Sequence, residues 1–415
     1  MAKLISVNSL SRELAAELDR NDRFAFQRSM FARPAGAIYL DGNSLGLLSQ
    51  PSEAAVLRAL AMWRENAVGG WFHDDGWLTA FSRCVDRLER LTGAEHGEVT
   101  LGSSTTVALH QFAATFFQPK PGRDCILVDD TCFPSDSYAL RSQLCLHGLS
   151  PETNLIRVKA GADGLVEEEA IVRAMQGPVV LAVLSAAIFT TGQLLSIPRL
   201  TEAAHAQGIL IGFDASHSVG AVPHQLHAWG PDFAIWCGYK YLNGGPGAPS
   251  GVFMHRRHFG RSAGLAGWFG SHPERMFEMK PVQSPAPGAA AMGMGTPPVL
   301  SLAALDGALE VFDGAPIDEL RAKSVELTEW LIALADLKLG AMGFTVASPR
   351  DAERRGGHVA LRHEHAQEIC RRLLQKGIVP DYRPPDIIRL APAPLYNGWC
   401  DCWDAVTAIS EIAGS

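Results

Sequence analysis

The chain has 415 residues, a formal net charge of −8, and 47% hydrophobic and 19% charged residues. This length predicts one large and one small domain, and the composition is that of a packed globular protein rather than a disordered one. The negative net charge argues against a nucleic-acid-binding surface.

The composition also indicates a cytoplasmic protein. The longest apolar run, residues 179–189, is far shorter than the ~20 residues that cross a bilayer. The first 19 residues lack the apolar core and the cleavage site of a secretory signal peptide. The eight cysteines form no CxxC pair, which favours buried, reduced thiols over a disulfide framework.

The first hundred residues are predicted to be mostly helical, because apolar residues recur at helical spacing. Pro51 suits the first turn of a helix. The predicted elements of this part are a helix at 9–19 with Ser9 or Ser11 as its N-cap, a strand at 38–40, a helix at 51–66, an aromatic-rich loop at 69–73 and a helix at 78–91.

The middle of the chain alternates short apolar runs with helical segments. This pattern predicts an α/β fold with a mostly parallel sheet that is covered on both faces. The predicted strands are 99–101, 126–128, 155–158, 179–184, 209–213, 232–237 and 251–254.

The C-terminal part predicts a small α+β unit that follows a long bridging helix from Pro297. Its expected elements are a helix at 317–337, a strand at 357–362, a helix at 365–376, a strand at 387–390 and a helix at 403–412. We therefore expect three parts, namely an N-terminal segment packing with the small domain (1–50), a large cofactor-binding domain (51–305) and a small C-terminal domain (306–415).

Two neighbouring apolar runs end in residues with useful chemistry. The run 209–213 ends in Asp214, and the run 232–237 is followed by Tyr239 and Lys240. Ligands of open α/β sheets bind at the carboxyl ends of strands. Pyridoxal phosphate (PLP) needs a lysine for its Schiff base and a carboxylate for its pyridine nitrogen, so the pattern predicts a PLP site. The alternative is that the acid and the amine cap two core strands and meet solvent.

Further signals follow other predicted strands. The hydroxyl-rich turn 102–106 precedes a helix and suits a phosphate, although a plain helix cap is the alternative. The segment 133–136 either offers an aromatic ring that stacks on a flat ligand or forms an ordinary turn. Ser185 ends another predicted strand and is likewise either a ligand contact or an ordinary turn residue. Arg389 suits a substrate carboxylate or is a surface arginine.

Two rival sites are disfavoured. His363, Glu364 and His365 could ligate a metal, but alternate residues diverge on a strand, so we expect no metal. The glycine-rich loop 244–251 lacks the G-x-G-x-x-G pattern after a first strand, which excludes a dinucleotide site.

In this order of signals the chain resembles the kynureninase family, which has the fold-type I PLP-dependent architecture of aspartate aminotransferase. The resemblance extends from Tyr39 to Asn397. Relatives such as cysteine desulfurases and class V aminotransferases share the order of these segments but not their amino-acid sequences. The matching strings are YLDGNSLGL, TTVALH, FPSD, TTGQ, GFDASHSVG, DFAIWCGYKYLN, GWFG, GTPPVL and IRLAPAPLYN.

The resemblance implies roles for particular residues in a homodimer with active sites at the subunit interface. Lys240, Tyr239 and Asp214 are implied as catalytic residues. Arg389 is implied to grip the substrate carboxylate, with Trp71 and Trp268 beside the aryl ring. The implied cofactor contacts are Lys240 through the Schiff base, Asp214 and Asp136 at the ring, Phe133 stacked on it, Pro134, Ser135 and His217 nearby, Thr105, Thr106, Ser185 and Tyr239 at the phosphate end, and Trp268 and Thr296 across the interface.

The implied reaction is hydrolysis of L-kynurenine to anthranilate and L-alanine by Cβ–Cγ cleavage, in tryptophan catabolism or NAD biosynthesis. Thr296 replaces the asparagine of some members, and Trp71 stands where animal enzymes carry a histidine, so the preference for 3-hydroxy-L-kynurenine stays open. Another fold-type I enzyme, such as a cysteine desulfurase or class V aminotransferase, and a non-catalytic PLP-binding regulatory protein are the alternatives.

Overall fold

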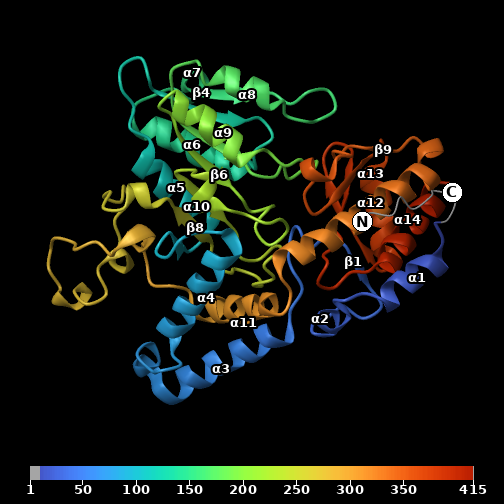
Figure 1. Ribbon diagram of the computed structural model, residues 1–415, viewed down its shortest axis with the longest axis horizontal. Coiled ribbons are helices and arrows are strands. Elements are labelled where there is room, and N and C mark those ends of the chain that lie inside the picture. Colours follow the sequence, from blue (N-terminus) through green and yellow to red (C-terminus); the bar gives the residue numbers. More distant parts are fainter. Residues whose placement is uncertain (1–9, 415) are drawn as a thin grey trace.

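The computed structural model describes residues 10–414, which form two sheet-containing parts joined by long helices (Figure 1). Helix α1 (Arg12–Arg20) is capped by Ser11, whose Oγ accepts a hydrogen bond from the Leu14 N–H at 3.1 Å. Ser9, the other predicted cap, lies outside the described residues. Within the described part of the chain, no helix combines the length and the apolar character that a membrane crossing requires.

The larger part is built on a seven-stranded sheet with the order β2-β8-β7-β6-β5-β3-β4. Strands β4, β3, β5, β6 and β7 run parallel, whereas β8 runs antiparallel to both of its neighbours. The predicted mostly parallel sheet is therefore confirmed. The strands are β2 (Val99–Leu101), β3 (Cys125–Asp129), β4 (Leu155–Val158), β5 (Val179–Ser185), β6 (Leu210–Asp214), β7 (Phe233–Trp236) and β8 (Gly251–Met254).

Apolar clusters cover both faces of this sheet, as near-continuous hydrophobic strands require. In β3, Ile126 and Val128 join one cluster with residues of α5 and α6, while Leu127 joins the opposite cluster with residues of α4, α9 and α11. The helices of this part are α3 (Gln50–Asn66), α4 (Trp77–Thr92), α5 (Thr105–Phe116), α6 (Pro134–Leu146), α7 (Pro151–Asn154), α8 (Glu168–Ala174), α9 (Ile197–Ala206), α10 (Leu226–Trp229) and α11 (Val299–Asp313).

The smaller part is a four-stranded antiparallel sheet with the order β12-β13-β10-β9, covered by helices. The N-terminal segment reaches it, because β1 (Ile38–Tyr39) pairs in parallel with β11 (Ile378–Val379) and α1 contacts α14. The remaining elements are α2 (Ala25–Ser29), α12 (Ile317–Lys338), β9 (Thr345–Val346), β10 (Val359–Arg362), α13 (Ala366–Gln375), β12 (Asp381–Arg383), β13 (Ile387–Leu390) and α14 (Trp399–Ala413).

Several details differ from the sequence prediction. The segment 69–73, expected as a loop, is largely a 3₁₀ helix, Ala67–Trp71. The segment 133–136 is no isolated turn, because residues 134–136 form the first turn of α6. Helix α14 begins at Trp399, four residues before the predicted start. The predicted part boundary at 305/306 falls inside α11, and the division into three parts stays a prediction.

Candidate active site

Three neighbouring strands deliver polar residues to one edge of the large sheet. Asp129, Ser185 and Asp214 are the last residues of β3, β5 and β6, and Ser185 pairs in register with Asp214. The Ser185 N–H donates to Asp129 Oδ2 at 2.9 Å, and burial raises the pKa of the Asp129 carboxyl. Asp129 was not among the predicted site residues, although it ends an apolar run in the same way as Asp214.

Two carboxylates meet at this edge. Asp136, from the first turn of α6, is almost fully buried and shares a hydrogen bond with Asp214. Burial, and then the nearby charge of Asp214, raises the pKa of Asp136 well above its usual value. Two carboxyl groups this close cannot both ionise at low cost. The pair is therefore suited to a positively charged or N–H-bearing group.

Lys240 lies beside the carboxylate pair, just after the end of β7. Its Nζ is 2.9 Å from His217 Nε2 and 5.7 Å from the centre of the Phe133 ring. The Phe133 side chain is 39% exposed, and its edge contacts Phe189 at a centroid distance of 5.3 Å. The structure thus brings together an amine, a histidine and a partly exposed aromatic ring, all three of which the family resemblance implied as cofactor contacts.

Tyr239 stands next to the amine, with its ring centre 6.0 Å from Lys240 Nζ. Burial raises the pKa of the Tyr239 phenol, and the neighbouring Cys237 thiol adds to the increase. The phenol therefore stays protonated at neutral pH and is available as a hydrogen-bond or proton donor.

Arg389 reaches the site from β13 of the small sheet and is fully buried. Its Nε and Nη2 donate to Asp381 Oδ2 at 2.5 Å, its Nη1 donates to the Phe189 carbonyl at 2.7 Å, and its Nη2 donates to Ser44 Oγ at 3.3 Å. The side chain is not the surface arginine of the alternative interpretation. Sequence reasoning did not identify Asp381 as its partner.

The hydroxyl-rich turn lies at the N-terminus of α5. Ser104 caps the helix by accepting the Val107 N–H at 3.3 Å. Thr105 Oγ1 and Ser250 Oγ are buried and have no hydrogen-bond partner among residues 10–414, which is unusual for hydroxyls and marks a place for a polar ligand. Thr296 lines a hollow together with residues of the same turn. Unpaired hydroxyls at the N-terminus of a helix fit a phosphate group.

The two tryptophans of the predicted aryl site lie apart from these residues in the single chain. Trp71 packs against Trp77 with centroids 5.1 Å apart, and Trp268 packs against Phe277 at 5.6 Å. Among the described residues, no ring contact or hydrogen bond joins either indole to Lys240. The segments that carry them lie at the lower and left edges of Figure 1, and not between the two sheets.

Cysteines near the site are poorly suited to nucleophilic attack. Cys132 and Cys237 are buried, and burial raises the pKa of both thiols, with further increases from Asp129 beside Cys132 and Asp214 beside Cys237. Because the thiolate is the reactive form, both side chains are held in the unreactive thiol form.

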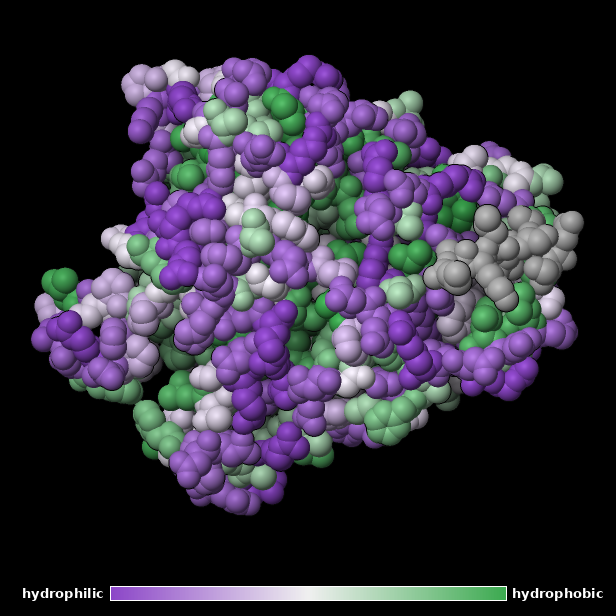
Figure 2. Space-filling model, viewed as in Figure 1, coloured by the Kyte–Doolittle hydropathy of each residue, from purple (hydrophilic) through white to green (hydrophobic). Residues whose placement is uncertain are grey.

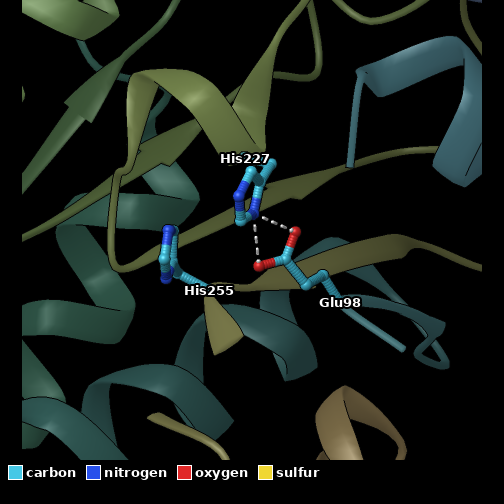
Figure 3. Close-up of side chains that lie close together, drawn as sticks. All are labelled: Glu98, His227 and His255. Carbon is cyan, nitrogen blue, oxygen red and sulfur yellow. Dashed lines mark hydrogen bonds and ion pairs between the residues drawn. The ribbon is translucent and has the colours of Figure 1, made fainter. Parts of the chain in front are cut away.

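A histidine and carboxylate cluster lies elsewhere, at the β2–β8 edge (Figure 3). His227 Nδ1 is 3.0 Å from Glu98 Oε1, and its Nε2 is 3.1 Å from Glu95 Oε1. The His227 and His255 rings are nearly parallel, with centroids 5.1 Å apart. One ion cannot lie in both ring planes, where the nitrogen lone pairs point. The cluster is therefore an ion-pair network, with Arg256 also bound to Glu95 and Glu98.

The segment His363-Glu364-His365, disfavoured above as a metal site, is also used structurally. His363 Nε2 is 3.1 Å from the Met342 carbonyl, and its Nδ1 accepts the His365 N–H at 3.1 Å. The His363 ring also stacks on Phe344 at 4.1 Å.

Comparison with solved structures defines the class of protein. The fold matches that of the cystine C-S lyase C-DES mutant with glycine covalently linked to its PLP cofactor, with a TM-score of 0.81 at 15% identity over 92% of this chain and 99% of that chain. It also matches the cysteine desulfurase CsdA of Escherichia coli, with a TM-score of 0.79 at 17% identity over 94% and 98%. The chain has the fold of the fold-type I PLP-dependent enzymes.

Comparison with sequences narrows this class. Residues 320–409 match the family described as the kynureninase C-terminal domain. The chain is 46% identical to the kynureninase of Geobacillus thermodenitrificans over 96% of its own length and 94% of the relative. It is 42% identical to the kynureninase of Shouchella clausii over 97% and 94%. The chain belongs to the kynureninase family.

Proposed function

We propose that this protein is a PLP-dependent hydrolase that cleaves L-kynurenine to anthranilate and L-alanine. The observation that carries the proposal is near-full-length similarity to kynureninases combined with Lys240, Tyr239 and Arg389 in one site. The place of the reaction in tryptophan catabolism and the kynurenine pathway follows from this substrate.

The residues present fit the cofactor. Lys240 would hold its aldehyde carbon, Asp214 and Asp136 would face the pyridine nitrogen, and Phe133 would stack on the ring. Thr105 and Ser250, whose hydroxyls are buried and unpaired, would meet the phosphate. When bound, pyridoxal phosphate supplies an electron sink for the carbanion that forms at the substrate α-carbon.

The chain's own residues would then act on the substrate. Arg389 would bind the substrate carboxylate and fix the α C–H bond in the orientation that favours its cleavage. Lys240 would accept the α-proton. It could pass this proton on to His217, whose Nε2 lies 2.9 Å from Lys240 Nζ. Water attack at the substrate γ-carbonyl breaks the Cβ–Cγ bond. The protonated Tyr239 would move protons in those later steps.

The other site residues complete the assignment. Thr106 is exposed in the first turn of α5, and Pro134 and Ser135 begin α6 beside Phe133. We assign these residues, with Ser185 and His217, to the walls of the cofactor site.

Trp71, Trp268 and Thr296 would contribute from the second subunit of a homodimer. Large hydrophobic side chains are exposed on α3, on the following turn and in the 265–282 loop, and Figure 2 shows hydrophobic surface at the left projection and the lower edge. Such patches are typical of protein interfaces. Trp63→Glu should convert the dimer to monomer in sedimentation, whereas a monomeric parent protein would contradict the dimer. The exposed residues are Leu57, Leu60, Trp63, Val68, Phe72, Trp268, Phe277, Met279 and Val282.

We also propose that the protein is located in the cytoplasm. This location is supported by the eight cysteines, all of which are free thiols among the described residues.

A fluorescence assay for anthranilate, with kynurenine and 3-hydroxykynurenine in parallel, tests the function. We expect turnover of kynurenine without any added keto acid, which separates hydrolysis from transamination. Alanine and sulfur release from cysteine with no turnover of either kynurenine would instead make the chain a desulfurase. A shift in cofactor absorbance on adding kynurenine, without product, would make it a binding protein.

A further inference from the structure

A second histidine, His358, lies beside the site on the side of the small sheet. It immediately precedes β10, whose Ala360 pairs with Arg389 of β13. The His358 side chain is buried, and its ring centre is 6.2 Å from that of His217 with the planes inclined at 66°. Sequence reasoning assigned no role to His358, and neither the cofactor contacts nor the steps proposed above use it.

His217 has one satisfied and one unsatisfied ring nitrogen. Its Nε2 lies 2.9 Å from Lys240 Nζ, while its Nδ1 is buried and has no partner in the described part of the chain. An N–H of Lys240 Nζ can donate across this distance, and Nε2 is then the acceptor. Burial, together with the charges of Lys240, Arg389 and Arg383, lowers the pKa of His217 well below its usual value. A neutral ring that accepts at Nε2 carries its proton on Nδ1, which is therefore a donor without an acceptor.

His358 has the opposite deficiency. Its ring hydrogen-bonds the backbone of Thr190, whereas its Nε2 is buried and meets no hydrogen-bond partner among the residues that the structure describes. Burial, and then the charges of Arg389, Arg383 and Lys240, lower the pKa of His358 to about 3. A neutral ring that donates to a carbonyl from one nitrogen presents the other as an acceptor. The edge with Nε2 faces Gly192, where a Cβ would lie 3.3 Å away, so no side chain there supplies a donor.

The unpaired donor of His217 and the unpaired acceptor of His358 complement each other. A centroid separation of 6.2 Å is too long for a direct hydrogen bond between the two rings and suits one bridging water. We propose that His358 is a positioning residue: through one water its Nε2 accepts the hydrogen bond of His217 Nδ1–H, which keeps His217 Nε2 as the acceptor that holds Lys240.

This arrangement links two functions of the site. His358 directly precedes β10, which pairs with the strand β13 that carries Arg389, so the part of the small sheet that would bind the substrate carboxylate would also set the environment of the Lys240 amine. The inference rests on the proposed function only in treating Lys240 as the reactive amine.

Two substitutions in the holoenzyme separate the acceptor from the rest of the ring. His358→Asn places an amide nitrogen where Nδ1 lies, so it keeps the bond to Thr190 but lacks the acceptor at Nε2. His358→Gln offers an acceptor near the Nε2 position. The first readout is the pH titration of the visible cofactor absorbance in the resting enzyme, without substrate. The second is kcat and KM for kynurenine, and thermal unfolding checks that each variant is folded.

We expect His358→Asn to move the midpoint of the absorbance titration by about one pH unit. It should also lower kcat about tenfold while KM changes less than about threefold. His358→Gln should behave much like the parent enzyme in both readouts. A parent-like titration for His358→Asn overturns the proposal, as do equal changes in both variants, because these would reflect packing alone. If the parent enzyme releases no anthranilate, the proposed function fails, but the absorbance titration still decides the role of His358.

Discussion

Arg389 offers a quantitative test of how the substrate is held. Arg389→Lys keeps the positive charge beside Asp381 but removes the planar fork, which now bonds Asp381, the Phe189 carbonyl and Ser44. A lysine ammonium cannot hold a carboxylate with two parallel N–H bonds. Losing one charge-assisted hydrogen bond from the transition state costs about 1.5–3 kcal/mol. Since 1.4 kcal/mol corresponds to a factor of ten, kcat/KM should fall by about 10- to 150-fold.

The assay is initial-rate anthranilate fluorescence across a range of kynurenine concentrations. The matched control is Arg383→Lys, because Arg383 also bonds Asp381 Oδ2, at 2.9 Å, but from the neighbouring strand β12 and with a partly exposed side chain. We expect the control to change kcat/KM by less than about threefold, as for a partly exposed ion pair. An unchanged kcat/KM in Arg389→Lys, or an equal loss in both variants, would refute Arg389 as the carboxylate-binding residue.

Three further predictions concern other residues. Lys240→Ala should abolish turnover and the visible absorbance of the lysine-bound cofactor, and normal turnover in this variant would refute the proposed role of the amine. Tyr239→Phe should keep exchange of the substrate α-proton with solvent, measured by NMR in D₂O, while anthranilate release falls about 10²-fold or more; equal losses of both would contradict a role confined to the later steps. Burial opposes ionisation of Asp232, but hydrogen bonds from His205, His258 and a backbone N–H outweigh it and hold the pKa of Asp232 below its usual value. That stabilisation is present above the unfolded-state pKa of about 4 and is lost as the pH falls towards the folded-state pKa. Asp232→Asn should therefore lower the free energy of unfolding in urea by about 3 kcal/mol at pH 7 and by less at pH 3. A loss of stability that does not vary with pH would contradict this prediction.

The sequence predicts the large sheet well because its strands are buried on both faces. Strands β5, β6 and β7 are short apolar runs with few competing interpretations, and each was expected within two residues of its observed bounds. Strands β9, β11 and β12 were missed because two or three residues are too few to show alternation.

The start of α14 was predicted four residues too late, and part of its cap comes from a distant residue. The N–H groups of Trp399 and Cys400 donate to the Asp19 carboxylate at 2.8 and 3.1 Å. Asp19 lies 380 residues earlier in the chain, so only the tertiary fold brings this cap to the helix.

Some residues of the candidate site could be predicted from the sequence and others could not. Asp214 and Lys240 could be predicted because each follows an apolar strand, and ligands gather at strand ends. His358 and Asp381 carry no such signal, because His358 meets His217 of the large part, and Asp381 meets Arg389 only through the pairing of β12 with β13. The family resemblance supplied the position of Arg389 in the site, which spacing alone left open.

Hydrolysis of the Cβ–Cγ bond of kynurenine by this chain can be tested through the balance of its products. Purified holoenzyme with L-kynurenine, and with no keto acid or thiol present, should release anthranilate and L-alanine in equal amounts, by fluorescence and amino-acid analysis. Release of neither product, or conversion of kynurenine only when a keto acid is supplied, would contradict the account.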